Sequence, residues 1–465
     1  MKRIAIIGGG ISGLSAAFTL EKHRRAGLEL GYSLFESSPR LGGVLLTEHV
    51  DGCLVEGGPD SFLTEKPWAA GLCREIGLAD QLIDSNDHDR KTYILVKNQL
   101  VPMPDGLMFM VPTKMLPAIW SPLFSTRTKF RIMQEWFHSP RESSADESVA
   151  SFVERHYGAE VVDRLADPLL SGVYGGQASK LSLRAVLPRF AEMEASHGSL
   201  GRAMISARRK ASTPTGRPLF TSLKNGMQQM VEALVAHLPA STLHLNTPVL
   251  AIQPQDKRWL VSAGYSSDEF DAVIVSTSAQ AAARLGLPEK LANSLDAIEH
   301  TSSVTVTLAY DVSVRKALPP GFGFLVPRSE GKRLLAATFV HNKFPHRAPE
   351  DRALFRCFLG GARDPAILNQ SDDEILHIVR QELRQVLNLT AEPLFTRLYR
   401  WKDAMAQYNV GHIERIQAIE KICRELPALA LAGNAYHGIG VPDCIRSGAD
   451  AANHILNTLG VAPPE

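Results

Sequence analysis

Apolar runs that stop at polar or glycine residues mark two strands near the start of the chain. Residues 2–7 place four apolar side chains in six positions without alternation and stop at Gly8, which predicts a strand buried on both faces. Residues 12–24 repeat apolar positions at helical spacing and close in a charged cluster, so we expect a helix there. A second strand is predicted over residues 30–35, ending at Glu36. This order is that of a βαβ unit.

The middle of the chain carries a mixed pattern. Helical spacing predicts helices over residues 68–77 and 148–168. Residues 101–137 between them are rich in Pro, Met and aromatic side chains. We therefore interpret residues 91–219 as a largely helical insertion and as a candidate membrane-facing region.

Apolar runs after this insertion predict more strands. Those at 241–251, 259–263 and 272–276 are expected to resume the first sheet. Two later runs, at 304–310 and 334–339, alternate apolar and polar positions and are rich in β-branched residues. That pattern is typical of a separate antiparallel sheet with one solvated face, and we expect this sheet to carry the substrate.

The end of the chain returns to the first pattern. A buried strand is predicted at 428–432, and a glycine-rich turn leads from it into a helix at about 444–459. The predicted fold class is α/β, with a discontinuous Rossmann-like domain, a helical insertion and an antiparallel-sheet substrate domain. The Rossmann-like domain is assigned residues 1–90, 220–290 and 425–465, and the substrate domain is assigned residues 291–424.

Composition and charge exclude several classes of protein. A length of 465 residues suggests two or three domains. Apolar residues make up 45% of the chain and charged residues 21%, which is typical of a globular protein. A formal net charge of +1 leaves no basic footprint for nucleic acid. No run of about 18 apolar residues could span a membrane, and glycines interrupt the N-terminal apolar run, against a signal peptide. Five cysteines without CxxC spacing indicate reduced thiols, so we expect a cytoplasmic protein with at most peripheral contact with the cytoplasmic membrane.

A glycine turn joins the first strand to the first helix and predicts a dinucleotide site. Gly8 permits the tight turn, Gly10 lets a pyrophosphate approach the backbone, and Gly13 lets helix and strand pack closely. Ser12 lies with them at the helix N-terminus, which attracts phosphate. Glu36 can accept the hydrogen bonds of a ribose 2′-OH and would repel a 2′-phosphate, so NADP is disfavoured.

A second loop separates NAD from FAD. Arg40, Gly42 and Gly43 follow Glu36 closely and resemble the second phosphate-side loop of FAD proteins of the glutathione-reductase type. In such flavoproteins a C-terminal helix points its positive N-terminus at the flavin ring. The matching positions at that end of the chain are Gly433, Gly440, Val441 and Ile445.

Motifs that the sequence lacks narrow the chemistry. It contains no second G-x-G-x-x-G turn for a nicotinamide cofactor, no CxxC redox pair and no cluster at metal-ligand spacing. Electrons are therefore expected to enter from the substrate and to leave to an acceptor that needs no motif. Molecular oxygen is the simplest such acceptor, and no metal site is predicted.

Together these features resemble the protoporphyrinogen/coproporphyrinogen oxidase family of haem biosynthesis. The resemblance covers nearly the whole chain and includes segments 56–63, 171–176, 322–327, 401–412 and 438–445. It implies non-covalent FAD in a domain of the glutathione-reductase/amine-oxidase type. The implied reaction is oxygen-dependent oxidation of protoporphyrinogen IX to protoporphyrin IX, or of coproporphyrinogen III to coproporphyrin III. Hydride passes to FAD, and hydrogen peroxide is formed.

The resemblance also assigns residues around the substrate and the flavin. The backbone carbonyl of Gly172 is implied to lie near the substrate, with no essential catalytic side chain. Phe322 and Phe358 match apolar positions that line the tetrapyrrole slot. Three further positions match contacts to FAD, namely Gly57, Trp401 beside the ring, and Val249, whose backbone would contact adenine.

Basic residues near the mouth of the slot are implied to bind the propionates. The candidates are Lys66, Arg90, Lys91 and Lys97. We assign the role to Lys91 and Lys97.

Two other functions fit part of the same pattern. A flavin amine oxidase shares the glycine turn, the Gly-Gly pair and the C-terminal helix, but Cys444 stands in a context that favours non-covalent flavin. A non-enzymatic lipid-binding protein on the same fold is the second alternative, against which the intact Gly10, Gly13 and Glu36 argue.

Expected partners are the tetrapyrrole, molecular oxygen and the next enzyme of the haem pathway, whereas the oligomeric state stays open. Residues 101–137 combine apolar side chains with Lys114, Arg127, Lys129 and Arg131, which suits docking on an anionic membrane. An internal helical surface is the alternative. The apolar side chains in question are Met108, Phe109, Met110, Trp120, Phe124 and Trp136.

Overall fold

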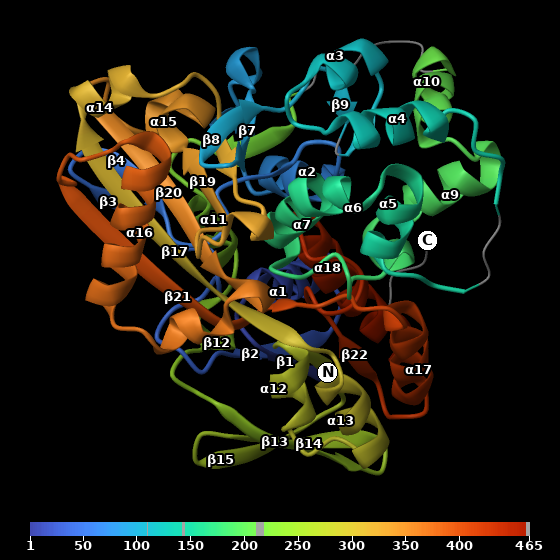
Figure 1. Ribbon diagram of the computed structural model, residues 1–465. Coiled ribbons are helices and arrows are strands. Elements are labelled where there is room, and N and C mark those ends of the chain that lie inside the picture. Colours follow the sequence, from blue (N-terminus) through green and yellow to red (C-terminus); the bar gives the residue numbers. More distant parts are fainter. Residues whose placement is uncertain (109, 142–144, 211–217, 462–465) are drawn as a thin grey trace.

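The chain builds its Rossmann-like domain around a five-stranded parallel sheet. The computed structural model describes residues 1–108, 110–141, 145–210 and 218–461. The strands, in spatial order, are β12 (Leu243–His244), β2 (Leu30–Phe35), β1 (Lys2–Ile7), β16 (Ala272–Val275) and β22 (Leu429–Leu431) (Figure 1). The two strands predicted nearest the N-terminus are confirmed to the residue. Because the strands come from the start, middle and end of the chain, the domain is discontinuous, as expected.

Both faces of this sheet are covered, which explains why β1 is apolar without alternation. Ile4 and Ile6 pack on one face, and Ala5 and Ile7 pack on the other. The first face is covered by α1 (Ile11–Arg25), α2 (Pro67–Glu75), α11 (Gln228–Ala236) and α18 (Val441–Thr458). The second is covered by α12 (Ala279–Ala283), α13 (Glu289–Asp296), α17 (His412–Arg424) and a small sheet.

That small sheet corrects one prediction. It contains β13 (Val249–Gln255), β14 (Arg258–Ala263) and β15 (Ser266–Phe270), and it is antiparallel. The strand expected at 241–251 is therefore split between two sheets, and the one at 259–263 does not resume the parallel sheet. Every second residue of β14, beginning at Trp259, is buried, and such alternation suits a half-covered antiparallel strand.

A seven-stranded sheet forms the second layer and confirms the predicted antiparallel sheet. Its order is β21 (Phe395–Ala406), β17 (His300–Asp311), β20 (Arg352–Gly360), β19 (Ala336–Phe339), β18 (Gly323–Leu325), β7 (Thr92–Val96) and β8 (Gln99–Pro102). Only β18 and β7 pair in parallel within it. β7 and β8 belong to the stretch from residue 91 that we expected to be helical. They form a tight hairpin, because Lys97 and Asn98 both adopt positive φ.

The two faces of this sheet differ in chemistry. Val304, Val306 and Leu308 of β17 pack in the apolar core beneath α16 (Asp372–Leu387). Thr305 and Thr307 point to the opposite face and are also buried. The prediction of a solvated face is wrong, because this polar face lies against the chain that follows β4 (Cys53–Glu56).

The helices from α3 (Met115–Trp120) to α10 (Leu200–Lys210) form a separate unit with its own core, here called the helical domain. Figure 1 shows it on the upper right, facing the seven-stranded sheet on the left. It contains α3 (Met115–Trp120), α4 (Thr126–Glu135), α5 (Val149–Tyr157), α6 (Ala159–Val161), α7 (Asp167–Tyr174), α8 (Leu183–Val186), α9 (Pro188–His197) and α10 (Leu200–Lys210).

Short elements complete the fold. They are β3 (Thr47–Val50), β5 (Phe62–Leu63), β6 (Leu82–Asp84), β9 (Leu107–Met108), β10 (Val111–Pro112), β11 (Phe220–Leu223), α14 (Val312–Ala317) and α15 (Val340–Lys343). Among the described residues, no helix combines the length and apolar character needed to cross a bilayer.

Candidate active site

The turn after β1 has the geometry that its glycines predict. Gly8 has a φ of +106°, and a Cβ on it would lie 2.9 Å from the Ser276 carbonyl oxygen. A Cβ on Gly13 would lie 1.9 Å from the Gly8 carbonyl oxygen, so only glycine lets α1 pack this closely. A Cβ on Gly10 would meet nothing within 4 Å. The open space therefore lies at the N-terminus of α1, where a phosphate would bind.

Glu36 is fixed beside this turn. Its carboxylate accepts hydrogen bonds from the amides of Gly9, at 2.7 Å, and Ser38, at 2.8 Å. The Glu36 carbonyl accepts from the amide of Thr247, at 2.9 Å, two residues before Val249 begins β13. The structure thus brings Glu36 near the segment expected to contact adenine.

The loop that carries Arg40 lies across the same open space. The Gly42 amide donates to the Gly9 carbonyl at 2.8 Å, and a Cβ on Gly43 would lie 3.3 Å from the Cα of Gly10. The Arg40 guanidinium donates to carbonyl oxygens of its own loop, including that of Leu45 at 3.1 Å. Burial lowers the pKa of Arg40, although the charge of Glu36 opposes this effect.

The first turn of α18 meets the first turn of α1. The Ser15 hydroxyl donates to the Ile445 carbonyl at 2.7 Å, and a Cβ on Gly448 would lie 2.1 Å from the Ser12 carbonyl oxygen. Gly440 caps α18, and Val441 follows it as the first helical residue. Two helix N-termini therefore converge on one region, which favours negative charge there.

Polar contacts fix the approach to α18. Asp443 accepts from the Gly440 amide at 3.2 Å and pairs with Lys66 at 2.6 Å. Gly433, just after β22, has a φ of +133°, and its amide donates to the Ser447 hydroxyl at 3.1 Å. Burial raises the pKa of the neighbouring Cys444 thiol to about 12, so this thiol stays protonated at neutral pH.

Gly57 and Trp401, two residues predicted to contact the flavin, are in contact with each other. The Gly57 carbonyl accepts from the Trp401 indole N–H and from the Thr305 hydroxyl, each at 2.8 Å. A Cβ on Gly58 would lie 1.7 Å from the Val44 carbonyl oxygen, so this segment also abuts the loop with Gly43.

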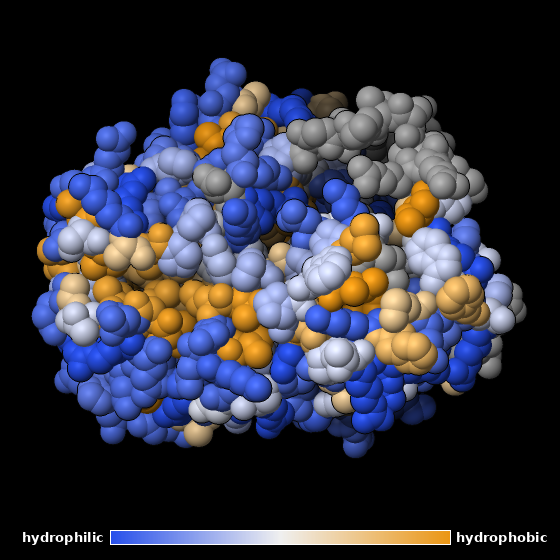
Figure 2. Space-filling view, turned by 45° about the horizontal axis from the view of Figure 1, so that its top comes forward, coloured by the Kyte–Doolittle hydropathy of each residue, from blue (hydrophilic) through white to orange (hydrophobic). Residues whose placement is uncertain are grey.

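The residues expected at the substrate lie on the second sheet and the helical domain. Phe322 is buried just before β18, and Phe358 is half-buried on β20. Gly172 is exposed on α7, and a Cβ there would meet nothing within 4 Å. Figure 2 shows a hollow near the middle of one face, between the seven-stranded sheet on the left and the helical domain on the right.

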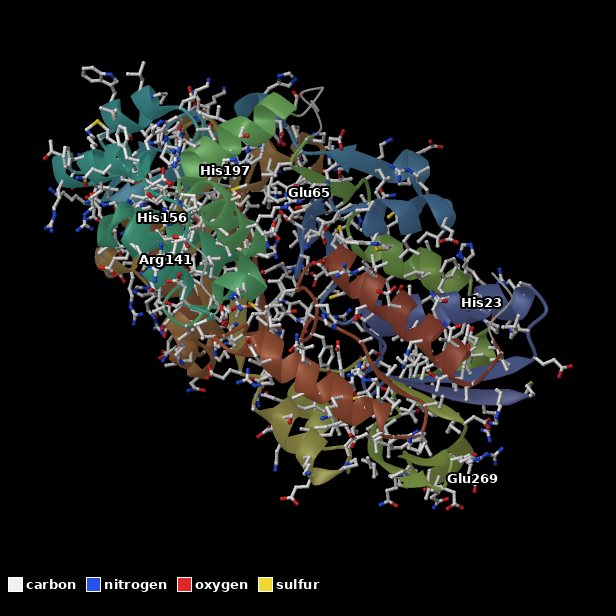
Figure 3. The ribbon with its side chains drawn as sticks, turned by 90° about the vertical axis from the view of Figure 1, so that its right-hand side faces the viewer. His23, Glu65, Arg141, His156, His197 and Glu269 are labelled. Atoms are coloured by element: carbon white, nitrogen blue, oxygen red, sulfur yellow. The ribbon has the colours of Figure 1, made fainter. Side chains whose placement is uncertain are left out.

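The two lysines assigned to the propionates are far apart. The Lys91 carbonyl accepts from the Phe322 amide at 2.7 Å, so the backbone of Lys91 adjoins Phe322. Lys97 is exposed at the other end of β7, about 20 Å away at the usual rise of a strand. Glu65, the residue before Lys66, pairs with Arg189 of α9 at 3.4 Å. Figure 3 shows Glu65 between the helical domain, where His156 is labelled, and α18.

A buried ionic cluster lies behind Gly57 and was missed by sequence reasoning. It contains two carboxylates and three cations, namely Glu56, Asp60, Lys343, Arg347 and Arg356. Lys343 lies 3.0 Å from Asp60, and Arg347 lies 3.1 Å from Glu56. Burial alone would raise the pKa of Asp60, but Lys343 and the two arginines bring it well below its usual range. The one available signal was Arg356, a charged residue inside the apolar run of β20.

Comparison with known proteins decides the family. The model of the flavin-containing amine oxidoreductase family matches residues 11–456. The chain belongs to this family. This flavin-containing oxidoreductase is 35% identical to the coproporphyrinogen III oxidase of Bacillus subtilis, over 98% of both chains. It is 28% identical to protoporphyrinogen oxidase 2 of Arabidopsis thaliana, over 98% of this chain and 94% of the relative.

Solved structures agree with the fold. One from Exiguobacterium sp. 255-15, provisionally assigned as a protoporphyrinogen oxidase, superposes with a TM-score of 0.88 at 31% identity over 99% of both chains. A putrescine oxidase superposes with a TM-score of 0.68 at 17% identity, over 98% of this chain and 99% of that one. The second likeness shows the fold alone.

The residues present fit FAD, the cofactor of this flavoenzyme. The cradle at Gly10 and Gly43 is free of side chains, and two helix N-termini face it. The Glu36 carboxylate is held in place beside this cradle and could accept the hydrogen bonds of a ribose, and Trp401 is hydrogen-bonded to the Gly57 carbonyl. No group of three or more His, Cys, Asp or Glu side chains in the described part of the chain is arranged to hold a metal ion.

Proposed function

We propose that this flavoenzyme oxidises coproporphyrinogen III to coproporphyrin III in haem biosynthesis, with oxygen as acceptor and hydrogen peroxide as the by-product. The observation that carries the proposal is similarity along the full chain, at 31–35% identity, to three bacterial proteins named coproporphyrinogen III oxidase. Two plant proteins named protoporphyrinogen oxidase are 28% and 29% identical. Protoporphyrinogen IX is therefore the alternative substrate.

The protein's part in this reaction is to bind and orient. Bound FAD would supply the acceptor for hydride from a bridge carbon and the route of the electrons to oxygen. The pyrrole nitrogens activate the bridges, so no protein nucleophile is required. Phe322 and Phe358 supply apolar walls on the sheet side, and the exposed backbone of Gly172 offers a carbonyl to a pyrrole N–H. Correct placement of one bridge carbon is the main contribution of these residues.

Aerobic assay of the purified holoenzyme with each porphyrinogen tests the reaction. We expect coproporphyrin fluorescence to appear faster than autoxidation and faster than protoporphyrin from the other substrate. Preference for protoporphyrinogen IX would change the substrate but keep the reaction class. Oxidation of a primary amine, without porphyrin formation, would instead support the amine oxidase alternative.

Release of the cofactor on denaturation tests whether FAD is non-covalent. Because the Cys444 thiol is buried and protonated, we expect all flavin to stay in the supernatant when the protein is precipitated by acid. Flavin that remains in the pellet would contradict this expectation. Protein purified without flavin that also fails to take up FAD would support the lipid-binding alternative.

Propionate binding is proposed for Lys91, with Lys66 as the alternative. Lys91 adjoins Phe322, and Lys66 pairs with Asp443 at the start of α18, whereas Lys97 lies in a hairpin turn at the other end of β7 from Lys91. Replacing the true ligand by Met should raise KM for coproporphyrinogen III about tenfold and leave kcat within about twofold. Lys97→Met is the matched control, and an equal rise there would contradict the proposal.

Contact with a membrane is proposed for α3, α4 and the residues that follow α4. Trp120 and Phe137 are 82% and 81% exposed, and Leu116 is 69% exposed. Arg127 and Lys114 are exposed nearby, which suits anionic lipid. Met110 and Phe124 are buried and belong to the internal core instead, and Phe109 lies outside the described residues.

Vesicle sedimentation tests this surface. We expect the protein to sediment with phosphatidylglycerol vesicles and not with phosphatidylcholine vesicles, and we expect Trp120→Ser with Phe137→Ser to abolish binding. The control pair is Tyr265→Ser with Leu250→Ser. Both are exposed apolar residues of the small antiparallel sheet, Leu250 in β13 and Tyr265 in the turn between β14 and β15. Binding lost equally in both pairs would contradict the assignment.

A further inference from the structure

One buried arginine contacts both sides of the candidate active site. Arg356 and Phe358 are two residues apart on β20, so their side chains share one face of the seven-stranded sheet. That face is the polar one, because Thr307 and Thr305 lie directly opposite Arg356 and Phe358 on β17. Thr305 is also the residue whose hydroxyl binds the Gly57 carbonyl.

The contacts of Arg356 run in two directions. Its guanidinium donates to the Gly58 carbonyl and lies 4.0 Å from the Asp60 carboxylate. The same group lies over the Phe358 ring, 4.9 Å from its centre, which is a cation–π contact. One side chain therefore joins the Gly57–Gly58 backbone to the aromatic residue expected to line the substrate slot.

Burial of the Arg356 charge costs desolvation free energy, and the neighbouring carboxylates offset this cost. It is 5% exposed, and burial lowers its pKa although Asp60 and Glu56 oppose the shift. Asp60 is itself held by Lys343, at 3.0 Å. A paired and buried guanidinium has little freedom to move, because leaving its carboxylate or carbonyl would strand a charge without a partner.

The backbone that Arg356 holds is already tightly constrained. Gly58 abuts the Val44 carbonyl so closely that it has no room for a side chain. The Gly57 carbonyl receives two donors, and the Asp60 carbonyl accepts from Arg347 at 2.9 Å. Donors on the sheet side thus hold the carbonyls of residues 57, 58 and 60. Arg356 is the donor whose charged group also lies over the Phe358 ring.

We propose that Arg356 is a positioning residue that sets the separation between the flavin-side wall, Gly57–Gly58, and the substrate-side wall, Phe358. The inference rests on the proposed function for the identity of the two walls. Hydride transfer depends steeply on this separation, since a misplacement of about 1 Å can cost about 100-fold in rate. Arg356 itself does not take part in the chemistry.

Two substitutions separate the role of charge from that of the two-way contact. Arg356→Lys keeps a cation for Asp60 but cannot reach both walls with a planar group. Arg356→Met removes the cation. Arg352→Met is the control, because Arg352 begins the same strand and, among the residues that the structure describes, its ion pair is with the neighbouring Asp351, at 2.6 Å.

Three kinds of measurement test the role: the kinetics and the visible spectrum of the holoenzymes, and the affinity of the apoproteins for FAD. We expect both Arg356 variants to slow anaerobic flavin reduction by coproporphyrinogen III by at least about tenfold, with KM within about threefold. We also expect a shifted visible spectrum of bound FAD and a weaker Kd for FAD in reconstitution of the apoprotein. The loss should be larger in Arg356→Met, and Arg352→Met should match the parent protein in all three.

Each possible result supports or contradicts the positioning role of Arg356. If Arg356→Lys has the spectrum, Kd and reduction rate of the parent protein, the positioning role is wrong. If Arg356→Met does not fold, Arg356→Lys still decides. If the parent protein oxidises no porphyrinogen, the proposed function fails, but the spectrum and Kd still report whether Arg356 holds the flavin-side wall. Unchanged spectrum and Kd would then reject that role as well.

Discussion

At the scale of single residues, substitutions of two glycines in one turn are expected to affect different properties of the protein. Gly13→Ala places a methyl group 1.9 Å from a backbone oxygen, so we expect a loss of about 1–3 kcal/mol in the free energy of unfolding of the apoprotein. Gly10→Ala meets no protein atom, so apoprotein stability should not change. Its methyl group should instead occupy the phosphate cradle and weaken FAD binding. Denaturant unfolding of the apoprotein and FAD titration measure the two effects.

Equal loss of apoprotein stability in both variants would show that the space at Gly10 is not a cradle. The contrast also shows what local sequence can predict. The glycine spacing predicted both the tight turn and the open position, since each depends on residues within one βαβ unit.

Residues that meet across long separations in sequence could not be found in this way. Asp60 and Lys343 form an ion pair across 283 positions, and no local periodicity links them. Lys91 and Lys97 show the opposite error. They are close in sequence, but an extended strand between them separates their side chains.

At the scale of helices and strands, the contact between α1 and α18 should be sensitive to one methyl group. A Cβ on Gly448 would lie 2.1 Å from the Ser12 carbonyl oxygen, so Gly448→Ala should push the two helices apart. We expect a lower melting temperature and weaker FAD binding, because both helix N-termini face the cradle. Thermal unfolding with and without FAD measures this change.

Gly71→Ala is the matched control, since Gly71 is also inside a helix but is exposed with open space around it. There we expect no loss, and a gain of up to about 1 kcal/mol from helix propensity. A fall in melting temperature of the same size in both variants would contradict the close contact at Gly448.

Strand predictions succeeded where one local pattern decided the outcome. Residues 2–7 end in a continuous apolar run, residues 30–35 place large apolar side chains at four of six positions, and both strands match the prediction. The run at 241–251 failed because Asn246, with positive φ, breaks it and sends the two halves into different sheets. For β17, the alternation was correctly interpreted as a two-faced strand. Its polar face binds another segment of the protein, which local sequence does not reveal.

At the scale of the whole molecule, buried histidines should make stability fall on acidification. Burial lowers the pKa of His341 and of His412 to about 4, from an ordinary value of 6.5. Between these values the unfolded chain binds protons that the folded protein does not, so stability decreases as pH falls. Each histidine should contribute a loss of about 1.6 kcal/mol between pH 6.5 and pH 5.

Denaturant unfolding across this pH range, compared between the parent protein and His341→Asn, tests the effect. The His341 Nδ1 accepts from the Leu354 amide at 3.0 Å, and an Asn oxygen can take over this role without titrating. We expect a shallower pH dependence in the variant. Parallel curves for the two proteins would show that His341 does not contribute.

The strands of the parallel sheet come from distant parts of the chain, and this affects when the protein can bind its flavin during synthesis. β1 leaves the ribosome before its neighbour β16, which is synthesised about 270 residues later, and β22 and α18 follow later still. The phosphate cradle needs the first turn of α1 and the first turn of α18 together. A nascent chain therefore cannot retain its flavin until α18 has been synthesised, and acquisition of the yellow colour reports that segments more than 400 residues apart have come together.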